Sequence, residues 1–386
     1  MSQPAKHLTV LHYTACWLPL TENWIYSQLK HLPAWIETHV VCENVQNLEQ
    51  FATPNLHAFA DASGLEYYWD KGLRKLRLRD YLGFLIRQAR RVNAQIVHSH
   101  FGNTGWANHK AVEKLGARHV TTFYGFDVNR LPVIDPRWHT RYRELFASVD
   151  CILCEGPHMA ACIKGLGCPA EKVRVHHLGV RLEQIEYRPR CWQPGTPLRV
   201  LIAGTFRQKK GIPYAVAALG AMQTLVPLEI TLIGDATAEP RDQAEKRRIL
   251  SALDAHGLTS RTRLLGFRTH AELMREAYEH HVFLSPSVTA DDGDTEGGAP
   301  VVIIEMAASG MPVVSTRHCD IANVLPAGAL LADERDVDGL AARLRWLIEN
   351  PGQWEAGLCA ARRHVEQNFN AVTQGLRLAE IYAELV

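Results

Sequence analysis

The chain has 386 residues and a formal net charge of +1, with 47% apolar and 22% charged residues. This length and composition predict a folded protein of two domains and exclude a disordered chain, and the balanced charge gives no basis for nucleic-acid binding. Nine scattered cysteines, an N-terminus without a signal-peptide pattern and the lack of a run of about 18 apolar residues predict a reduced, cytoplasmic protein.

In the first half, short apolar segments rich in β-branched residues alternate with helical patterns. We predict strands at Leu8–Tyr13, His39–Cys42, Gln95–His100, His119–Phe123, Cys151–Cys154 and Val173–His176. This alternation is typical of a parallel sheet that helices cover on both faces.

The alternation restarts after a proline-rich segment, residues 187–197. We predict further strands at Leu198–Ala203, Glu229–Gly234, Thr262–Leu265, Val282–Ser285, Pro312–Ser315 and Ala329–Leu331, and only helices after them, the last at Ala371–Leu385. The pattern predicts two doubly wound α/β domains. Their expected bounds are 1–188 and 198–368, with a linker at 189–197 and a final helical segment at 369–386.

The segment Thr295–Thr316 is the most informative, because ligands of such sheets bind beyond the carboxyl ends of the strands. Gly297 and Gly298 allow a close approach of the backbone to a ligand. Pro300 suits the first position of a helix over Val301–Ser309. The free amides at that helix N-terminus would suit a phosphate.

Two glutamates accompany this helix. Glu305, one turn into it, would accept hydrogen bonds from a ribose diol, and Glu296, before it, would touch a sugar. The alternative is that both are solvated carboxylates. We favour function for Glu305, because its neighbours are small and apolar and a buried acid needs a partner.

A basic loop, Gly204–Gly211, directly follows the first predicted strand of the second half. It carries Arg207, Lys209 and Lys210 between glycines. Cations at the carboxyl end of a strand would neutralise a diphosphate leaving group. The alternative is a solvated basic loop. We favour diphosphate binding, because the loop directly follows a strand at the carboxyl edge of the sheet.

Together these segments resemble glycosyltransferase family 4, and in particular its exopolysaccharide and colanic-acid-type members. The resemblance extends over essentially the whole chain in order and spacing. Its segments are Leu20–Ile25 with Gln28, His98–Gly102, Thr122–Asp127, Gly167–Val173, His176–Val180, Gly204–Gly211, Ile233–Asp235, Leu265–Phe267, Phe283–Ser287 and Glu296–Thr316.

The resemblance implies a GT-B architecture, with two doubly wound Rossmann-like domains facing each other across a cleft. The acceptor would bind mainly the first domain and the nucleotide sugar mainly the second, and the last helical segment would cross back onto the first domain. It implies a retaining, metal-independent transfer of a hexose-type sugar from a UDP- or GDP-sugar to a saccharide or lipid-linked acceptor, without a permanently bound cofactor. The donor site would comprise Gly204, Thr205, Arg207, Lys210, Glu296, Gly297, Gly298, Ala299, Pro300, Val301 and Glu305, and the catalytic groups would be His100, Tyr124, Asp127, Arg207 and Lys210.

The chain departs from the family pattern at three places. Eight residues separate Glu296 from Glu305 where seven are usual, so Asp294 or Asp292 could take the place of Glu296. Thr205 stands where arginine is common, and Tyr124 where histidine is common; tyrosine is a poor base at neutral pH. These departures keep two alternatives open, a catalytically silent nucleotide-sugar-binding protein and another GT-B enzyme such as an epimerase.

Residues 71–91 are rich in lysine and arginine, interleaved with leucines and aromatic residues. A basic amphipathic helix there would contact the inner face of the cell membrane, which suits a lipid-linked acceptor. The alternative is a helix packed on the sheet with a solvated basic face.

Overall fold

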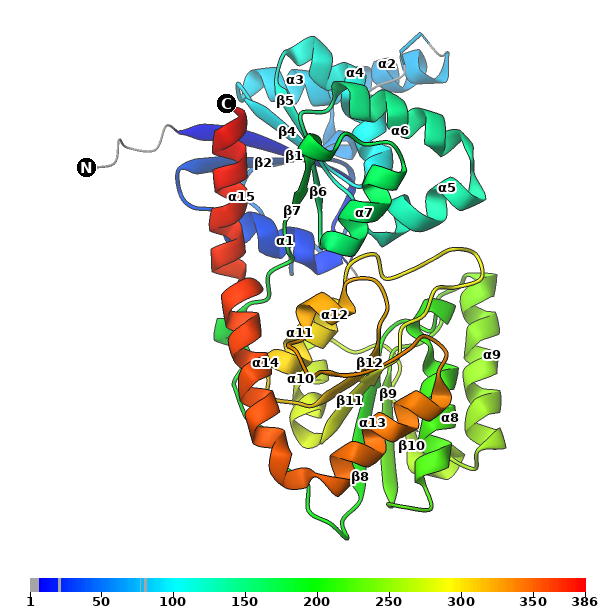
Figure 1. Ribbon diagram of the computed structural model, residues 1–386. Coiled ribbons are helices and arrows are strands. Elements are labelled where there is room, and N and C mark those ends of the chain that lie inside the picture. The colour runs from blue at the N-terminus through cyan, green and yellow to red at the C-terminus, as the bar shows by residue number, and fades with distance from the viewer. Residues whose placement is uncertain (1–6, 20–21, 77, 80–81) are drawn as a thin grey trace, which may run out of the picture. The chain divides into compact units, whose positions relative to one another are not determined.

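The computed structural model describes residues 7–19, 22–76, 78, 79 and 82–386 (Figure 1). Five residues of the sequence motifs lie outside the described residues: Leu20, Thr21, Arg77, Asp80 and Tyr81. The chain forms two compact units, one made of the chain up to Gly179 together with Ala371–Val386, and the other of Val180–Asn370. Residues 188 and 190 pack within the second unit, where their amides donate to the carbonyls of Ser309 and Gly310.

The first unit contains a seven-stranded parallel sheet in the order β3-β2-β1-β4-β5-β6-β7. Its strands are β1 (Leu8–Trp17), β2 (Ile36–Val45), β3 (Leu56–Ala58), β4 (Ile96–His100), β5 (Arg118–Thr122), β6 (Cys151–Cys154) and β7 (Val173–Val175). Its helices are α1 (Asn23–Lys30), α2 (Gly64–Lys75), α3 (Gly83–Arg91), α4 (Gly102–Leu115), α5 (Leu131–Ile134), α6 (Arg137–Ser148), α7 (Pro157–Gly165) and α15 (Ala371–Leu385).

Alternate residues of β1 bury opposite faces of this sheet. Leu11 and Tyr13 pack with α3 and α4, whereas Leu8 and Val10 pack with α15. Figure 1 shows α15 beside the strands of this unit. The final helix is therefore part of the first unit's core.

The second unit contains a six-stranded parallel sheet in the order β10-β9-β8-β11-β12-β13. Its strands are β8 (Leu198–Ala203), β9 (Leu228–Ile233), β10 (Thr262–Leu264), β11 (Val282–Ser285), β12 (Val313–Thr316) and β13 (Leu330–Ala332). Its helices are α8 (Ile212–Met222), α9 (Pro240–Ala255), α10 (His270–Glu279), α11 (Val301–Ala308), α12 (Ile321–Val324), α13 (Val337–Glu349) and α14 (Trp354–Asn368).

Helices α8, α9 and α13 cover one face of this sheet and α10, α11 and α14 the other. The prediction of two doubly wound α/β domains is thus confirmed. In each sheet the chain order reverses beside the first strand, between β1 and β4 and between β8 and β11. Ligand crevices form at such reversals.

The basic stretch 71–91 does not form the single helix that we predicted. Helix α2 ends at Lys75 and α3 begins at Gly83. Phe84, Leu85 and Ala89 of α3 are buried, so α3 is the packed helix of the alternative interpretation.

Candidate functional site

At the carboxyl edge of the second sheet, the basic loop lies against the segment that follows β11. The amide of Val288 donates to the carbonyl of Lys209 at 2.8 Å. Gly211 has a φ of 62°, and a Cβ there would lie 1.9 Å from the carbonyl oxygen of Pro286. Glycine is therefore required both for the left-handed backbone and for the close approach of the two loops.

Lys210 forms an ion pair with Glu296 at this edge. Its Nζ lies 2.9 Å from Oε1 and 3.0 Å from Oε2 of Glu296, and the hydroxyl of Ser287 donates to Oε1 at 3.0 Å. Burial alone would raise the pKa of Glu296, but the Lys210 and Lys209 ammonium groups lower it to about 2. The carboxylate is therefore charged and held in place.

Asp294 and Asp292, the alternatives to Glu296, point to other cations. Asp294 pairs with Lys209 at 3.1 Å and with Arg241 at 3.4 Å, and Asp292 pairs with Arg241 at 3.1 Å. Of the three acids, Glu296 is the one in an ion pair with Lys210.

Arg207 and Thr205 lie near Lys210 in sequence, but their contacts are with residues other than Glu296. The Arg207 guanidinium faces Asp242 at 3.4 Å and Glu239 at 3.9 Å, near the start of α9. The carbonyl of Thr205 accepts the amide of Arg207 at 2.7 Å. The structure therefore brings Lys210, and not Arg207, to the glutamate.

His318, which was not selected from the sequence, supports Glu296 from the backbone side. The amide of Glu296 donates to Nε2 of His318 at 3.0 Å, and Nδ1 of this buried ring lies 2.6 Å from Glu334. Its position two residues after β12, at the same edge of the sheet, is the sequence feature that could have identified it.

The loop Gly297–Pro300 leads into α11. Gly297 has a φ of 79°, and the carbonyl of Gly298 accepts the amide of Asp320 at 3.1 Å. We predicted Pro300 as the first helical residue and Ser309 as the last; instead they cap a helix over Val301–Ala308. The carbonyl of Pro300 accepts the amide of Ile303, as expected for a residue that caps a helix. The first turn of α11 therefore still begins directly after the glycine loop.

Glu305 has the partner that its buried position requires. Its Oε1 lies 2.8 Å from Nε2 of His270, the first residue of α10, and 13% of its side chain is exposed. This hydrogen bond raises the pKa of His270. His270 is another residue that was not selected from the sequence.

In the first unit, three histidines gather where β1 and β4 lie side by side. Nδ1 of His12 lies 3.1 Å from Nε2 of His100, and Nδ1 of His100 lies 2.9 Å from the hydroxyl of Tyr124. His98 bridges the hydroxyls of Tyr382 and Thr122 at 2.6 and 2.7 Å. Burial lowers the pKa of all three histidines, to about 3 for His100.

The ring nitrogens of these histidines lie within 4.8 Å of one another, a spacing that a transition metal could use. Both nitrogens of His98 and of His100 are hydrogen-bonded, whereas Nε2 of His12 has no partner among the described residues. Three metal ligands here would therefore require breaking existing hydrogen bonds.

Asp127 ties together the loops after β4 and β5. Its carboxylate accepts the amides of Gly102 and Tyr124, the latter at 2.7 Å. Burial raises its pKa to about 7, against these hydrogen bonds. Phe101 between the two loops has a φ of 74°, and strain of this kind in a non-glycine residue concentrates at functional sites.

Aromatic rings and an acid surround Tyr124. The rings of Phe101 and Trp24 lie 4.6 and 5.9 Å from its ring. Burial raises the pKa of Glu22 to about 7, and burial, together with Glu155 and Glu22, raises that of Tyr124. Neither Glu22 nor Trp24 was selected from the sequence as a site residue, although both belong to the motif at Leu20–Ile25.

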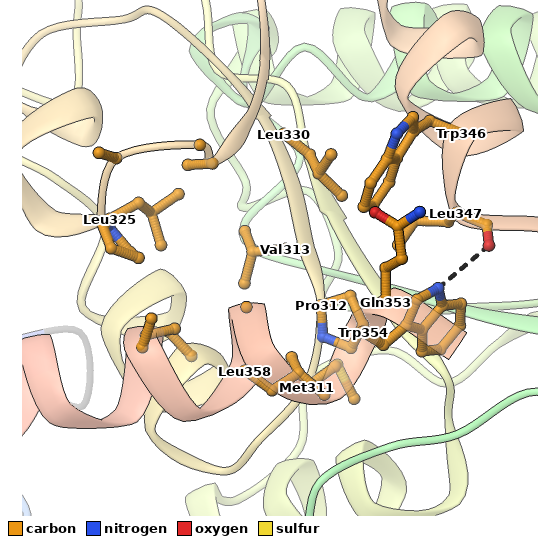
Figure 2. A pocket seen from close by; sticks show the side chains of 18 residues that line it. Met311, Pro312, Val313, Leu325, Leu330, Trp346, Leu347, Gln353, Trp354 and Leu358 are labelled. Carbon is orange, nitrogen blue, oxygen red and sulfur yellow. Dashed lines mark hydrogen bonds between the residues drawn. The ribbon is translucent and has the colours of Figure 1, made fainter. Parts of the chain in front are cut away.

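Figure 2 shows an apolar pocket elsewhere in the second unit, lined by Met311, Val313, Leu325, Trp346 and Trp354 among others. Its strand residues are at the starts of β12 and β13, so it lies at the amino edge of the sheet, opposite the Lys210–Glu296 pair. The residues that line it include no cation for a phosphate, so it is not a candidate donor site.

The comparisons with known proteins agree with this architecture. Models described as "Glycosyl transferases group 1" and "Glycosyltransferase Family 4" match residues 197–350 and 21–184. The amylovoran biosynthesis glycosyltransferase AmsK of Erwinia amylovora is 33% identical over 76% of this chain and 70% of its own. WcaL of Salmonella typhimurium, named for colanic acid biosynthesis, is 30% identical over 75% of this chain and 70% of its own.

Among solved structures, Anabaena Alr3699/HepE in complex with UDP and glucose has a TM-score of 0.75 at 17% identity, covering 98% of this chain and 100% of that one. This likeness shows a shared fold, the GT-B fold. With the family models and the similarity to AmsK, it leads to one conclusion: the chain is an enzyme that belongs to the family 4, or group 1, glycosyltransferases.

Proposed function

We propose that this enzyme transfers a hexose-type sugar, with retention of configuration and without a metal ion, from a UDP- or GDP-sugar to a growing exopolysaccharide or its lipid-linked precursor. Similarity to AmsK and WcaL supports the exopolysaccharide. The complex of HepE with UDP and glucose supports a nucleotide-sugar donor. We expect the reaction on the cytoplasmic side of the membrane, where nucleotide sugars are made.

The Lys210–Glu296 ion pair is the observation that carries the proposal. An ammonium group has three N–H donors, so Lys210 can keep Glu296 and also bind a diphosphate near the first turn of α11. Negative charge that develops on the leaving phosphate would be stabilised by both. Glu296 would then contact the donor sugar, and Glu305, held by His270, the ribose.

On the acceptor side we assign positioning roles to His100 and Asp127, because both are buried and fully hydrogen-bonded. Tyr124 is also buried and bonded to His100, so the half-buried Glu22 remains as the polar group of this edge that would meet the acceptor. The leaving phosphate would take the acceptor proton, so no strong protein base is required.

A thermal-shift screen with UDP, GDP, ADP and TDP, each with and without its sugar, tests the donor site. A ligand that binds only the folded state stabilises it by about 2.7 kcal/mol at one hundred times its dissociation constant. We expect a shift with UDP or GDP, and transfer to an acceptor by the matching sugar nucleotide, with the product anomer read by NMR. Binding without turnover across many acceptors would favour the silent binding protein, and no shift with any nucleotide would refute the site.

A further inference from the structure

Helix α2 carries a stripe of large apolar side chains that face away from the protein. Leu65, Tyr68, Trp69 and Leu76 are 90%, 73%, 67% and 69% exposed. Tyr68 and Trp69 follow Leu65 by three and four residues, and Leu76, the C-cap of α2, follows Trp69 by seven, which places all four on one face of the helix. We call these four residues the α2 stripe; Figure 1 shows α2 at the periphery of the first unit.

The opposite face of α2 is fixed to the unit, so the stripe cannot turn inward. Asp70 is fully buried and accepts the amides of Gly83 and Phe84 at 3.0 and 2.7 Å. The ring of Tyr67 stacks on Phe59 with centroids 4.9 Å apart. The helix therefore has two apolar faces, one of which the described part of the unit leaves uncovered.

Positive charge borders the α2 stripe. Lys71 and Lys75 lie along its edge, whereas Arg74 lies on the opposite face of α2 and pairs with Glu43 at 3.5 Å. The two acids of the helix point elsewhere, since Glu66 and Asp70 both form ion pairs with Arg87 at 2.5 and 3.3 Å. The exposed face of α2 is thus apolar in the middle and cationic at the side.

We propose that α2 is a membrane-docking helix, which lies in the interface of a bilayer rich in anionic lipid with the α2 stripe inserted. Trp and Tyr prefer the headgroup level, where a ring can be apolar on one side and hydrated on the other. Lysines at the border add attraction to anionic headgroups. The charge complementarity favours a lipid surface over an apolar protein groove.

The contact is peripheral, because no helix within the described ranges has both the length and the hydropathy to cross a bilayer. It is also a second site on the molecule, since α2 contributes none of the residues assigned to sugar transfer. Failure of vesicle binding would therefore leave the proposed reaction unaffected, and failure of sugar transfer would leave the membrane contact unaffected.

Co-sedimentation of the full chain with vesicles tests it, using phosphatidylcholine alone and phosphatidylcholine mixed with phosphatidylglycerol. We expect binding to the mixed vesicles at low salt, and at least a tenfold weaker partition, roughly, for Leu65→Ser/Leu76→Ser, from the lost apolar burial. Lys71→Glu/Lys75→Glu should weaken binding to anionic vesicles and remove its salt dependence.

The control is Leu225→Ser/Leu264→Ser, which removes two outward-facing leucines of the second unit that are 51% and 48% exposed, against 90% and 69% for Leu65 and Leu76. Because all four leucines face outward, both variants should keep the melting temperature of the parent. The proposal is overturned if the parent does not bind anionic vesicles at low salt, or if the α2 variant binds as the control does. It is also overturned if the α2 variant abolishes a dimer seen by light scattering, because the stripe then covers a second copy of the chain.

Discussion

The carboxyl edges of the two sheets share one topology and differ in how they satisfy polar groups. In the second unit, Lys210 and Glu296 are both charged, and their ion pair could be rearranged by an incoming anion. In the first unit, His12, His98 and His100 are neutral and fixed by hydrogen bonds. The carboxyl edge of such a sheet can therefore carry charged groups that bind a ligand, or neutral groups that hold neighbouring side chains in place.

Lys210→Ala would test the charged edge most severely. We expect transfer to fall by about 100- to 1,000-fold, the loss typical when one preorganised donor to a developing negative charge is removed. Melting temperature should fall as well, because Lys210→Ala leaves the buried carboxylate of Glu296 without its ion-pair partner, so transfer is compared at a temperature where both proteins stay folded. Steady-state kinetics measure the effect, and Lys246→Ala, which breaks the pair with Asp235, is the control; equal activity of the two variants would contradict the assignment.

Gly211→Ala asks whether the charged edge depends on the close approach of its loops. A left-handed alanine costs about 1–2 kcal/mol, and the clash with Pro286 should add about 1–3 kcal/mol. Gly257→Ala is a matched control, because Gly257 has a similar φ of 65° but a Cβ there would meet no described atom within 4 Å. Denaturant unfolding should show a larger loss for Gly211→Ala, together with weaker nucleotide binding; similar losses would mean that the loops need not touch.

Glu305→Gln would separate ribose binding from phosphate binding. A hydrogen bond to a charged group is worth about 1.5–3 kcal/mol, so calorimetry should show nucleoside diphosphate binding weakened by roughly tenfold or more. Inorganic diphosphate, which has no ribose, should bind as before. Glu355→Gln, at an exposed position, is the control; unchanged nucleotide affinity in Glu305→Gln would remove Glu305 from the site.

Acid should affect the two edges in different ranges of pH. The folded pKa of His100 is lowered from 6.5 to about 3, so the unfolded chain binds more protons and stability falls as pH drops through this range. The folded pKa of Glu296 is lowered from 4.5 to about 2, so its contribution is lost only below about 4.5. Asp127, with a raised pKa, acts in the opposite sense.

Thermal unfolding from neutral pH downward therefore distinguishes two variants. His100→Gln should make the fall in stability shallower by up to about 1.4 kcal/mol per pH unit below pH 6.5. Glu296→Gln should leave that range unchanged and alter only the range below about 4.5. If stability falls with pH in the same way for His100→Gln and the parent, burial does not lower the pKa of His100.

The strands show what local sequence can predict. Leu198–Ala203 was predicted with its observed bounds, because an apolar run between Pro197 and Gly204 leaves little choice. The three-residue strand Leu56–Ala58 was missed, since it is too short to show a period and is held by pairing with β2. The continuous basic helix at 71–91 was wrong, because Asp70 caps the start of α3 from a distance in sequence.

The candidate site shows the same limit. The sequence indicated that Glu305 needs a partner, but His270, which is 35 residues away in the chain, became visible only in the fold. Likewise the contact between Lys210 and Glu296 spans 86 residues. Spacing places each group at an edge of a sheet, and only packing decides which groups meet there.

Helix α15 has a consequence for the order in which the protein is made. Tyr382 and Leu378 are fully buried in the core of the first unit, and Tyr382 bonds to His98. The ribosome must therefore synthesise the entire second unit before the first can close its core. The second unit is continuous in the chain, so we expect it to fold first. Until α15 is made, one apolar face of the first unit's sheet stays exposed and can bind chaperones.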